Sequence, residues 1–132
     1  MQQDKPQDFV IATGVQYSVR QFIEWSALEL GVTLRYEGQG PEERVIVDTV
    51  RGKSAPAIKP GQTIVKIDPR YFRPTEVETL LGDPSKAKTQ LGWSPAITVQ
   101  EMCKEMVAED LKSAQQFSLL KANGFKLNIS TE

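Results

Sequence analysis

Hydrophobic and polar positions follow two different periods along the chain, and together they predict a succession of strands and helices. Continuous apolar runs over residues 8–14 and 32–36 are typical of strands, and the first of them resembles a buried strand. Between these runs, residues 19–30 carry apolar side chains every three or four positions, which is the spacing of one helix face. Ser18 and Gln21 form a capping-box signature at its start. The order of these elements predicts a β-α-β unit.

The middle of the chain contains two further runs of β-branched residues, over 44–50 and 63–68. Such residues are enriched in strands, so we expect both runs to be extended. The intervening residues 51–61 are rich in turn formers and outnumber what a tight hairpin needs. The pattern therefore predicts a β-hairpin with a long tip.

Residues 70–93 combine several start and stop signals for helices. Apolar positions within 77–81 have helical spacing, and Gly82 is a favourable residue just after a helix end. Asp83 is a typical capping residue for a second short helix. Trp93 then provides an apolar anchor that we expect to be buried.

A long helix is predicted to follow, because residues 98–101 form a second capping box ahead of an apolar pattern at three-four spacing. Met102 and Met106 are expected to fill the core. Cys103 on the same helix is expected to be an inert packed thiol. Residues 125–132 resemble a tail beyond the helix.

The composition argues against some classes of function but does not identify one. With 132 residues, the chain suits a single domain over 1–132 that would bury about two-thirds of its unfolded surface. The net charge of −1 gives no basis for nucleic-acid binding, and no apolar run is long enough for a membrane span. The polar start is unlike a signal peptide, so a cytoplasmic protein is expected. The fold class predicted is mixed α/β.

The absence of certain residue types excludes several kinds of active site. The sequence has one cysteine, which excludes an intrachain disulfide and a site built on several thiolates. It has no histidine, which excludes nucleophiles activated by histidine and the commonest metal ligand. Any chemistry must therefore use carboxylates, lysine, tyrosine or a borrowed cofactor, and we predict no metal-binding residue in this chain.

Arg73 and Glu76 are the candidate binding residues, since they lie three positions apart where a strand is expected to lead into a helix. The planar guanidinium of Arg73 suits a phosphate, and the carboxylate of Glu76 suits the vicinal hydroxyls of a ribose. The alternative is a surface ion pair at this spacing, worth only ~0.2–0.5 kcal/mol. Spacing alone does not separate the two interpretations.

Longer motifs in the same region carry a family resemblance. Residues 73–78 and 82–93 resemble the C-terminal signature of extended short-chain dehydrogenase/reductases that act on nucleotide sugars. Residues 8–22, 67–74 and 76–83 together are similar to the GDP-mannose 4,6-dehydratase family, and the similarity covers nearly the whole chain. The fold that this implies is the C-terminal substrate-binding subdomain of an extended Rossmann-type enzyme, here with a β-hairpin insertion.

The resemblance also implies a function. Enzymes of this kind are NADP-dependent lyases that convert GDP-mannose to GDP-4-keto-6-deoxymannose in GDP-fucose biosynthesis, and the full-length enzyme would be a homo-oligomer. By the same resemblance, Arg73 would bind the nucleotide diphosphate and Glu76 the ribose hydroxyls. Arg70 is a neighbouring candidate for substrate binding.

The chain also departs from the family pattern. The loop after residue 13 has one glycine where a dinucleotide fingerprint needs three, and no tyrosine is followed four positions later by lysine. We therefore predict that the N-terminal NADP-binding Rossmann domain is absent, with the catalytic residues that the resemblance assigns to that portion. No residue here is then catalytic or binds the cofactor, and the chain alone is expected to be inactive. Two alternatives remain open: the same portion of another nucleotide-sugar epimerase or decarboxylase, and a non-catalytic scaffold.

Overall fold

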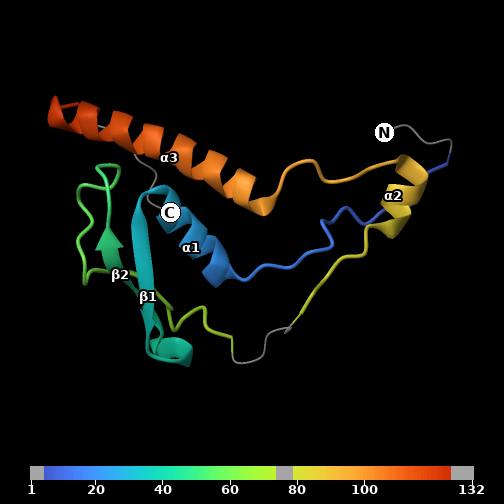
Figure 1. Cartoon of the computed structure of the whole chain (residues 1–132), viewed down its shortest axis with the longest axis horizontal. Coiled ribbons are helices and arrows are strands. Elements are labelled where there is room, and N and C mark those ends of the chain that lie inside the picture. The colour runs from blue at the N-terminus through green and yellow to red at the C-terminus, as the bar shows by residue number, and fades with distance from the viewer. Residues whose placement is uncertain (1–4, 74–78, 126–132) are drawn as a thin grey trace.

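The computed structural model describes residues 5–73 and 79–125 and has a mixed α/β fold (Figure 1). In chain order its elements are α1 (Val19–Glu29), β1 (Val32–Glu37), the 3-10 helix η1 (Gly40–Glu42), β2 (Arg44–Val50), β3 (Thr63–Lys66), α2 (Ser85–Leu91) and α3 (Val99–Ala122). We call α1, the strands and α3 the sheet lobe. We call α2 together with residues 5–14 and 79–84 the α2 lobe; extended segments join it to the rest (Figure 1).

The three strands form one antiparallel sheet in the order β1-β2-β3. β2 and β3 make the predicted hairpin, with Arg44 opposite Lys66 in the register. The predicted β-α-β unit is wrong, because residues 8–14 form no strand and Val10 and Ile11 are 51% and 52% exposed. The physical reason is that a strand needs a neighbour to pair with, and the described residues offer this segment none.

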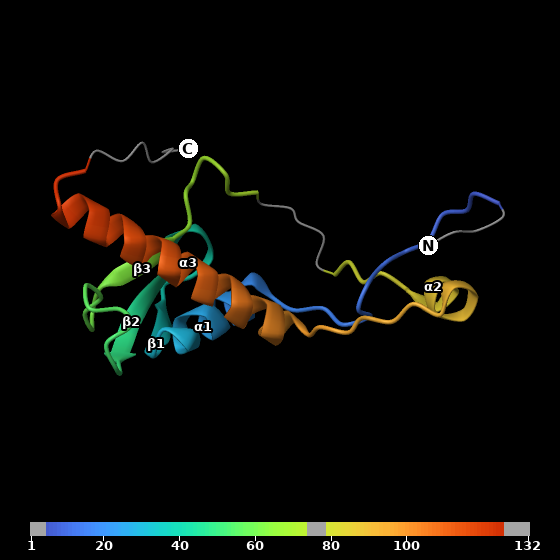
Figure 2. The ribbon, with the colours of Figure 1, turned by 90° about the horizontal axis from the view of Figure 1, so that it is seen from above.

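The core of the sheet lobe lies between α1 and the sheet. Ala27, Val32 and Val47 are buried against one another, and the partly buried Leu30 and Leu34 pack around them. α3 packs against α1, as both views show (Figures 1 and 2). The sheet lobe is therefore a small layered body in which α1 packs on the sheet and α3 packs against α1.

Local signals at helix ends act as predicted. The Ser18 hydroxyl accepts a hydrogen bond from the Gln21 backbone N–H at 3.1 Å, and the Gln21 side chain accepts from the Ser18 N–H at 2.8 Å. Thr98 and Glu101 form the same reciprocal pair at the start of α3. Both capping boxes are confirmed.

The apolar side chains of α3 are more exposed than its sequence predicts. Cys103 is fully buried, which confirms a packed thiol. Met102 and Met106 are 43% and 48% exposed, so the prediction that they fill the core is wrong. The reason is geometric, since α3 contacts α1 along one narrow stripe and turns its other faces to solvent.

The α2 lobe differs from prediction in several places. Residues 79–81 are irregular, so a helix over 77–81 is wrong for the described part, while residues 77–78 lie outside the described residues. Leu80 is 83% exposed there, and a short helix without packing is marginal in water. α2 begins at Ser85 with Pro84 as its N-cap residue, so the predicted cap at Asp83 is wrong by one position. The Asp83 carboxylate still accepts a hydrogen bond from the Ser85 N–H at 2.9 Å. Trp93 is half-buried rather than buried.

The molecule exposes far more surface than a compact protein of its mass. Its accessible surface is 11032 Å², against roughly 6,900 Å² expected for a folded monomer of this size. Folding therefore buries about half of the unfolded surface, and the expected two-thirds is wrong. Within residues 5–73 and 79–125, no helix has the length and apolar character needed to cross a membrane.

Candidate functional site

The turn that follows β3 carries the described candidate residues. β3 ends at Lys66, and the chain then turns so that the Tyr71 N–H donates to the Asp68 carbonyl at 3.0 Å. Arg70 lies in this exposed turn, and Arg73 is an exposed residue of the irregular chain just after it. Glu76 lies outside the described residues, so its predicted arrangement with Arg73 stays a prediction.

Arg70 is held by the carboxylate of Asp68. Its Nε lies 3.1 Å from both carboxylate oxygens, and its terminal nitrogen lies 2.6 Å from Oδ2. The Arg70 backbone N–H also donates to Oδ1 at 3.0 Å, and the guanidinium lies 5.4 Å from the centre of the Tyr71 ring. These bonds fix the direction of an otherwise exposed side chain.

The same contacts shift the acid–base equilibria of both groups. The side-chain hydrogen bond from Arg70, followed by the one from its backbone, lowers the pKa of Asp68. The hydrogen bond to Asp68 raises the pKa of the Arg70 guanidinium. The two groups therefore stay ionised as a surface ion pair, three residues before Arg73 in the chain.

A hollow of about 470 Å³ lies beside this turn and brings both signs of charge together. Its principal lining residues are Glu42, Glu43, Arg44, Lys66, Ile67 and Pro69. A second hollow of about 270 Å³ shares Glu43, Lys66 and Ile67 with the first. Arg44 and Lys66 are cross-strand partners, so the sheet itself places two cations near the Arg70 turn.

A network between α1 and β1 forms the wall of the second hollow, and sequence analysis missed it. The Arg20 guanidinium lies 4.4 Å from the centre of the Tyr36 ring and 2.5 Å from a carboxylate oxygen of Glu43. The Tyr36 hydroxyl donates to the Arg20 carbonyl at 3.3 Å. These partners are separated by 16 and 23 positions along the chain. No local pattern connects them, so only the fold reveals the network.

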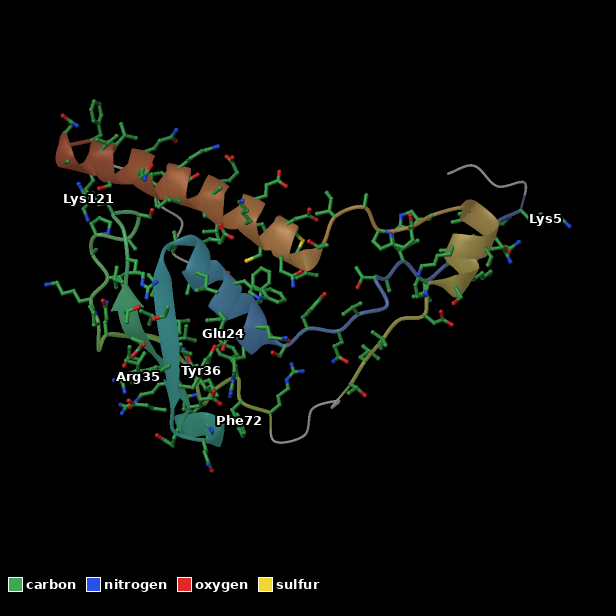
Figure 3. The ribbon with its side chains drawn as sticks, in the orientation of Figure 1. Lys5, Glu24, Arg35, Tyr36, Phe72 and Lys121 are labelled. Atoms are coloured by element: carbon green, nitrogen blue, oxygen red, sulfur yellow. The ribbon has the colours of Figure 1, made fainter. Side chains whose placement is uncertain are left out.

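The environment of Tyr36 explains its altered acidity. Burial raises the pKa of the phenol, and the negative charge of the neighbouring Glu24 raises it further. Both side chains lie where α1 faces β1 (Figure 3). Tyr36 therefore stays protonated and acts as a hydrogen-bond donor that ties β1 to α1.

Other reactive groups in the described part of the chain serve packing. The Cys103 sulfur is buried 3.3 Å from the Ser26 hydroxyl, at the contact of α3 with α1. Among residues 5–73 and 79–125, no group of three or more Cys, Asp or Glu side chains is placed to hold a metal ion. The cations near the hollow are partly neutralised, since Arg70 pairs with Asp68 and Arg44 with Glu37.

Comparison with known proteins identifies the family. A family model described as GDP-mannose 4,6 dehydratase matches residues 1–106. The chain belongs to the GDP-mannose 4,6-dehydratase family. It is 69% identical over 132 residues to a GDP-mannose 4,6-dehydratase of Vibrio cholerae, covering 100% of this chain and 36% of that protein. It is 56% identical to one of Yersinia enterocolitica, again over 100% of this chain and 36% of the relative.

More distant members of the family match as well. A human GDP-mannose 4,6 dehydratase is 42% identical over 112 residues, which is 85% of this chain and 27% of the human protein. The chain thus spans about a third of the length of the curated bacterial relatives that it matches from end to end. The predicted resemblance is confirmed, and so is the prediction that it covers nearly the whole chain.

Proposed function

We propose that this chain supplies the substrate-binding surface of an NADP-dependent GDP-mannose 4,6-dehydratase, a lyase that forms GDP-4-keto-6-deoxymannose from GDP-mannose. The observation that carries the proposal is the 69% identity to such an enzyme along the whole chain. The proposal includes GDP-fucose biosynthesis, a homo-oligomer and a cytoplasmic location, as the resemblance implies.

Within this proposal, Arg73 binds the diphosphate and Glu76 the ribose hydroxyls, with Arg70 as a neighbouring cation. The exposed positions of Arg70 in the turn and of Arg73 just after it support the assignment, because a diphosphate can engage more than one cation. The hollow beside the turn offers carboxylates and ammonium or guanidinium groups to the rest of the nucleotide.

The described residues do not fit NADP. The connection from residue 13 to α1 is a capped loop with a single glycine, whereas a pyrophosphate cradle at a helix N-terminus needs glycines for close backbone approach. In the proposed enzyme, the cofactor and the catalytic groups would therefore belong to the part of the relatives that this chain does not match.

The experiment uses a chimera in which this chain replaces the matching 132 residues of the Vibrio cholerae relative. The chimera should convert GDP-mannose to the 4-keto-6-deoxy product, and the isolated chain should not. Turnover by the isolated chain would contradict the proposal that the catalytic groups belong to the part of the relatives that this chain does not match. Turnover of UDP-sugars in preference to GDP-mannose would instead favour another nucleotide-sugar enzyme.

Substitution of Arg73 tests the binding role in the same chimera. Arg73→Ala should weaken GDP binding by at least about tenfold, the scale of one charged hydrogen bond of ~1.5 kcal/mol. The matched control is Arg51→Ala, which removes an exposed arginine from the hairpin connection. Calorimetry with GDP measures both. Equal affinities for the two variants would favour a scaffold role.

A further inference from the structure

A third hollow, mostly apolar, lies in the sheet lobe between α1, α3 and β3. Figure 2 shows α3 passing over β3, and the hollow of about 370 Å³ lies where these elements meet. Its apolar lining comes from Ala27, Leu30, Ile64, Val107, Leu111 and Ala114. Ile64 of β3 is 37% exposed there. The sheet lobe thus leaves an apolar surface uncovered beside its own core.

The end of α3 is built to turn the chain away from the helix axis. The Gly124 N–H donates to the Lys121 carbonyl at 3.1 Å, and the Phe125 N–H donates to the Leu120 carbonyl at 3.1 Å. Gly124 has a φ of 82°, in the left-handed region. These two bonds around a left-handed glycine form a Schellman motif. The chain therefore leaves the direction of α3 at Phe125.

Residues 126–132 follow this turn in the sequence and lie outside the described residues. Leu127 and Ile129 are separated by one polar residue, so in an extended segment both side chains face the same way. Extended chain of this length spans roughly 23 Å. The part of α3 from Val107 to Ala122 rises about 22 Å. The segment is therefore long enough to run back along α3 to the far end of the hollow.

We propose that residues 126–132 fold back along α3 and that Leu127 and Ile129 fill the apolar hollow between α1, α3 and β3. Removing the exposed Ile64 and the α3 side of the hollow from water supplies the driving force. This segment is favoured over a second copy or another part of a longer polypeptide because it begins at the end of the helix that forms one wall. The short connection gives it a high effective concentration at the hollow.

The comparisons with relatives are consistent with this pairing. The family model ends at residue 106, before Val107, Leu111 and Ala114. The relatives from Vibrio cholerae and Yersinia enterocolitica match the whole chain. The α3 wall of the hollow and residues 126–132 thus occur together in these relatives, beyond the part that the family model describes. The inference does not depend on the proposed substrate.

Methyl NMR of the full chain tests the contact directly. Nuclear Overhauser cross-peaks should connect the Ile129 methyl groups with those of Ile64 and Ala114. Mixed samples of isotope-labelled and unlabelled chains separate contacts within one chain from contacts between copies. Absence of the cross-peaks in the folded chain overturns the inference. Cross-peaks found only between chains also overturn it, since a second copy would then fill the hollow.

The same measurement in the Vibrio cholerae chimera defined above addresses the remaining occupant. The cross-peaks of Ile129 with Ile64 and Ala114 should persist in the chimera. Their replacement by contacts with the residues of the relative overturns the inference, because another part of the longer polypeptide would then fill the hollow.

Two variants and a truncated chain sharpen the test. Ile129→Ser should return the methyl chemical shifts of Ile64 and Ala114 to those of a chain that stops after Phe125. Asn128→Ser is the matched control, because the proposed segment turns this side chain away from the hollow, and it should leave the shifts unchanged. Equal shifts in the full and truncated chains overturn the inference. If the truncated chain fails to fold, equal shifts for Ile129→Ser and Asn128→Ser overturn it instead.

Discussion

The sheet lobe has a core of larger apolar side chains, whereas the described residues of the α2 lobe bury only the small Pro84 and Ala87. Val32 and Val47 of the sheet lobe are almost completely buried. Leu80 and Leu81 beside α2 are 83% and 59% exposed. Both lobes contain helices, although α3 begins with a capping box and α2 has no side-chain cap. The difference teaches that helix formation here needs only a few neighbouring residues, while a core of larger side chains needs partners that the α2 lobe lacks among the described residues.

The first prediction has the largest expected effect and compares one substitution in each lobe of the isolated chain. Val47→Ala should lower the free energy of unfolding by roughly 2 kcal/mol, because it removes buried methyl groups and leaves a cavity. Leu80→Ala removes exposed atoms and should change it by no more than about 0.5 kcal/mol. Urea denaturation followed by the fluorescence of Trp25 in α1 measures both.

One tryptophan in the sheet lobe and one just beyond the α2 lobe make this test specific. Trp25 lies on α1 in the sheet lobe, and Trp93 follows α2; both are half-buried. The variant Trp93→Phe therefore reports on the sheet lobe alone. A loss of stability for Leu80→Ala as large as that for Val47→Ala would mean that residues 79–81 are part of a packed core.

The comparison also explains which parts of the structure could be predicted from the sequence. The pair Ser18 and Gln21 lies within four consecutive residues, so its pattern determines the helix start without help from the rest of the chain. The hairpin of β2 and β3 is similarly local, and it was predicted. Residues 8–14 have the composition of a strand, but composition does not provide the neighbour with which a strand pairs.

The candidate site, too, could be predicted only in part from the sequence. Arg70 and Arg73 were found through a sequence motif, and both are exposed in the structure, in and just after one turn. The contact of Arg20 with Glu43 and Tyr36 spans distant positions, and it depends on how α1 packs on the sheet. Motifs thus supplied candidate binding residues, while the residues that build the walls of the hollows required the fold.

The second prediction concerns the cap of α3, which contributes to the sheet lobe through the contact with α1. Thr98→Ala removes the hydroxyl that accepts from the Glu101 N–H at 3.2 Å and should cost about 1 kcal/mol. Ser113→Ala, at an exposed position inside the same helix, is the matched control and should be neutral or slightly stabilising. Urea denaturation of the isolated chain measures both. Equal stabilities would show that α3 begins independently of its cap.

The smallest expected effect is a pH dependence of the free energy of unfolding, which should differ between the lobes. Hydrogen bonds from Thr98, the backbone one first, lower the pKa of Glu101 below its ordinary value of 4.5. Hydrogen bonds from Ser85, the side-chain one first, lower the pKa of Asp83 below 3.8. A carboxylate with a lowered pKa in the folded state contributes stability above its unfolded pKa and loses it as pH falls through the folded pKa. The contribution of Glu101 should therefore weaken below pH 4.5 and that of Asp83 below pH 3.8.

The two tryptophans separate these contributions. Glu101→Gln should flatten the acid side of the stability curve reported by Trp25, because the sheet lobe loses its titrating cap. Asp83→Asn should flatten the curve reported by Trp93 and leave that of Trp25 unchanged, since the Asp83 carboxylate accepts hydrogen bonds from Ser85 of α2. The measurement is the midpoint in urea at a series of pH values between about 3 and 6, a range that spans both ordinary values. If Asp83→Asn altered both curves equally, the two lobes would unfold as one cooperative unit. The stability of the sheet lobe would then not be independent of the α2 lobe.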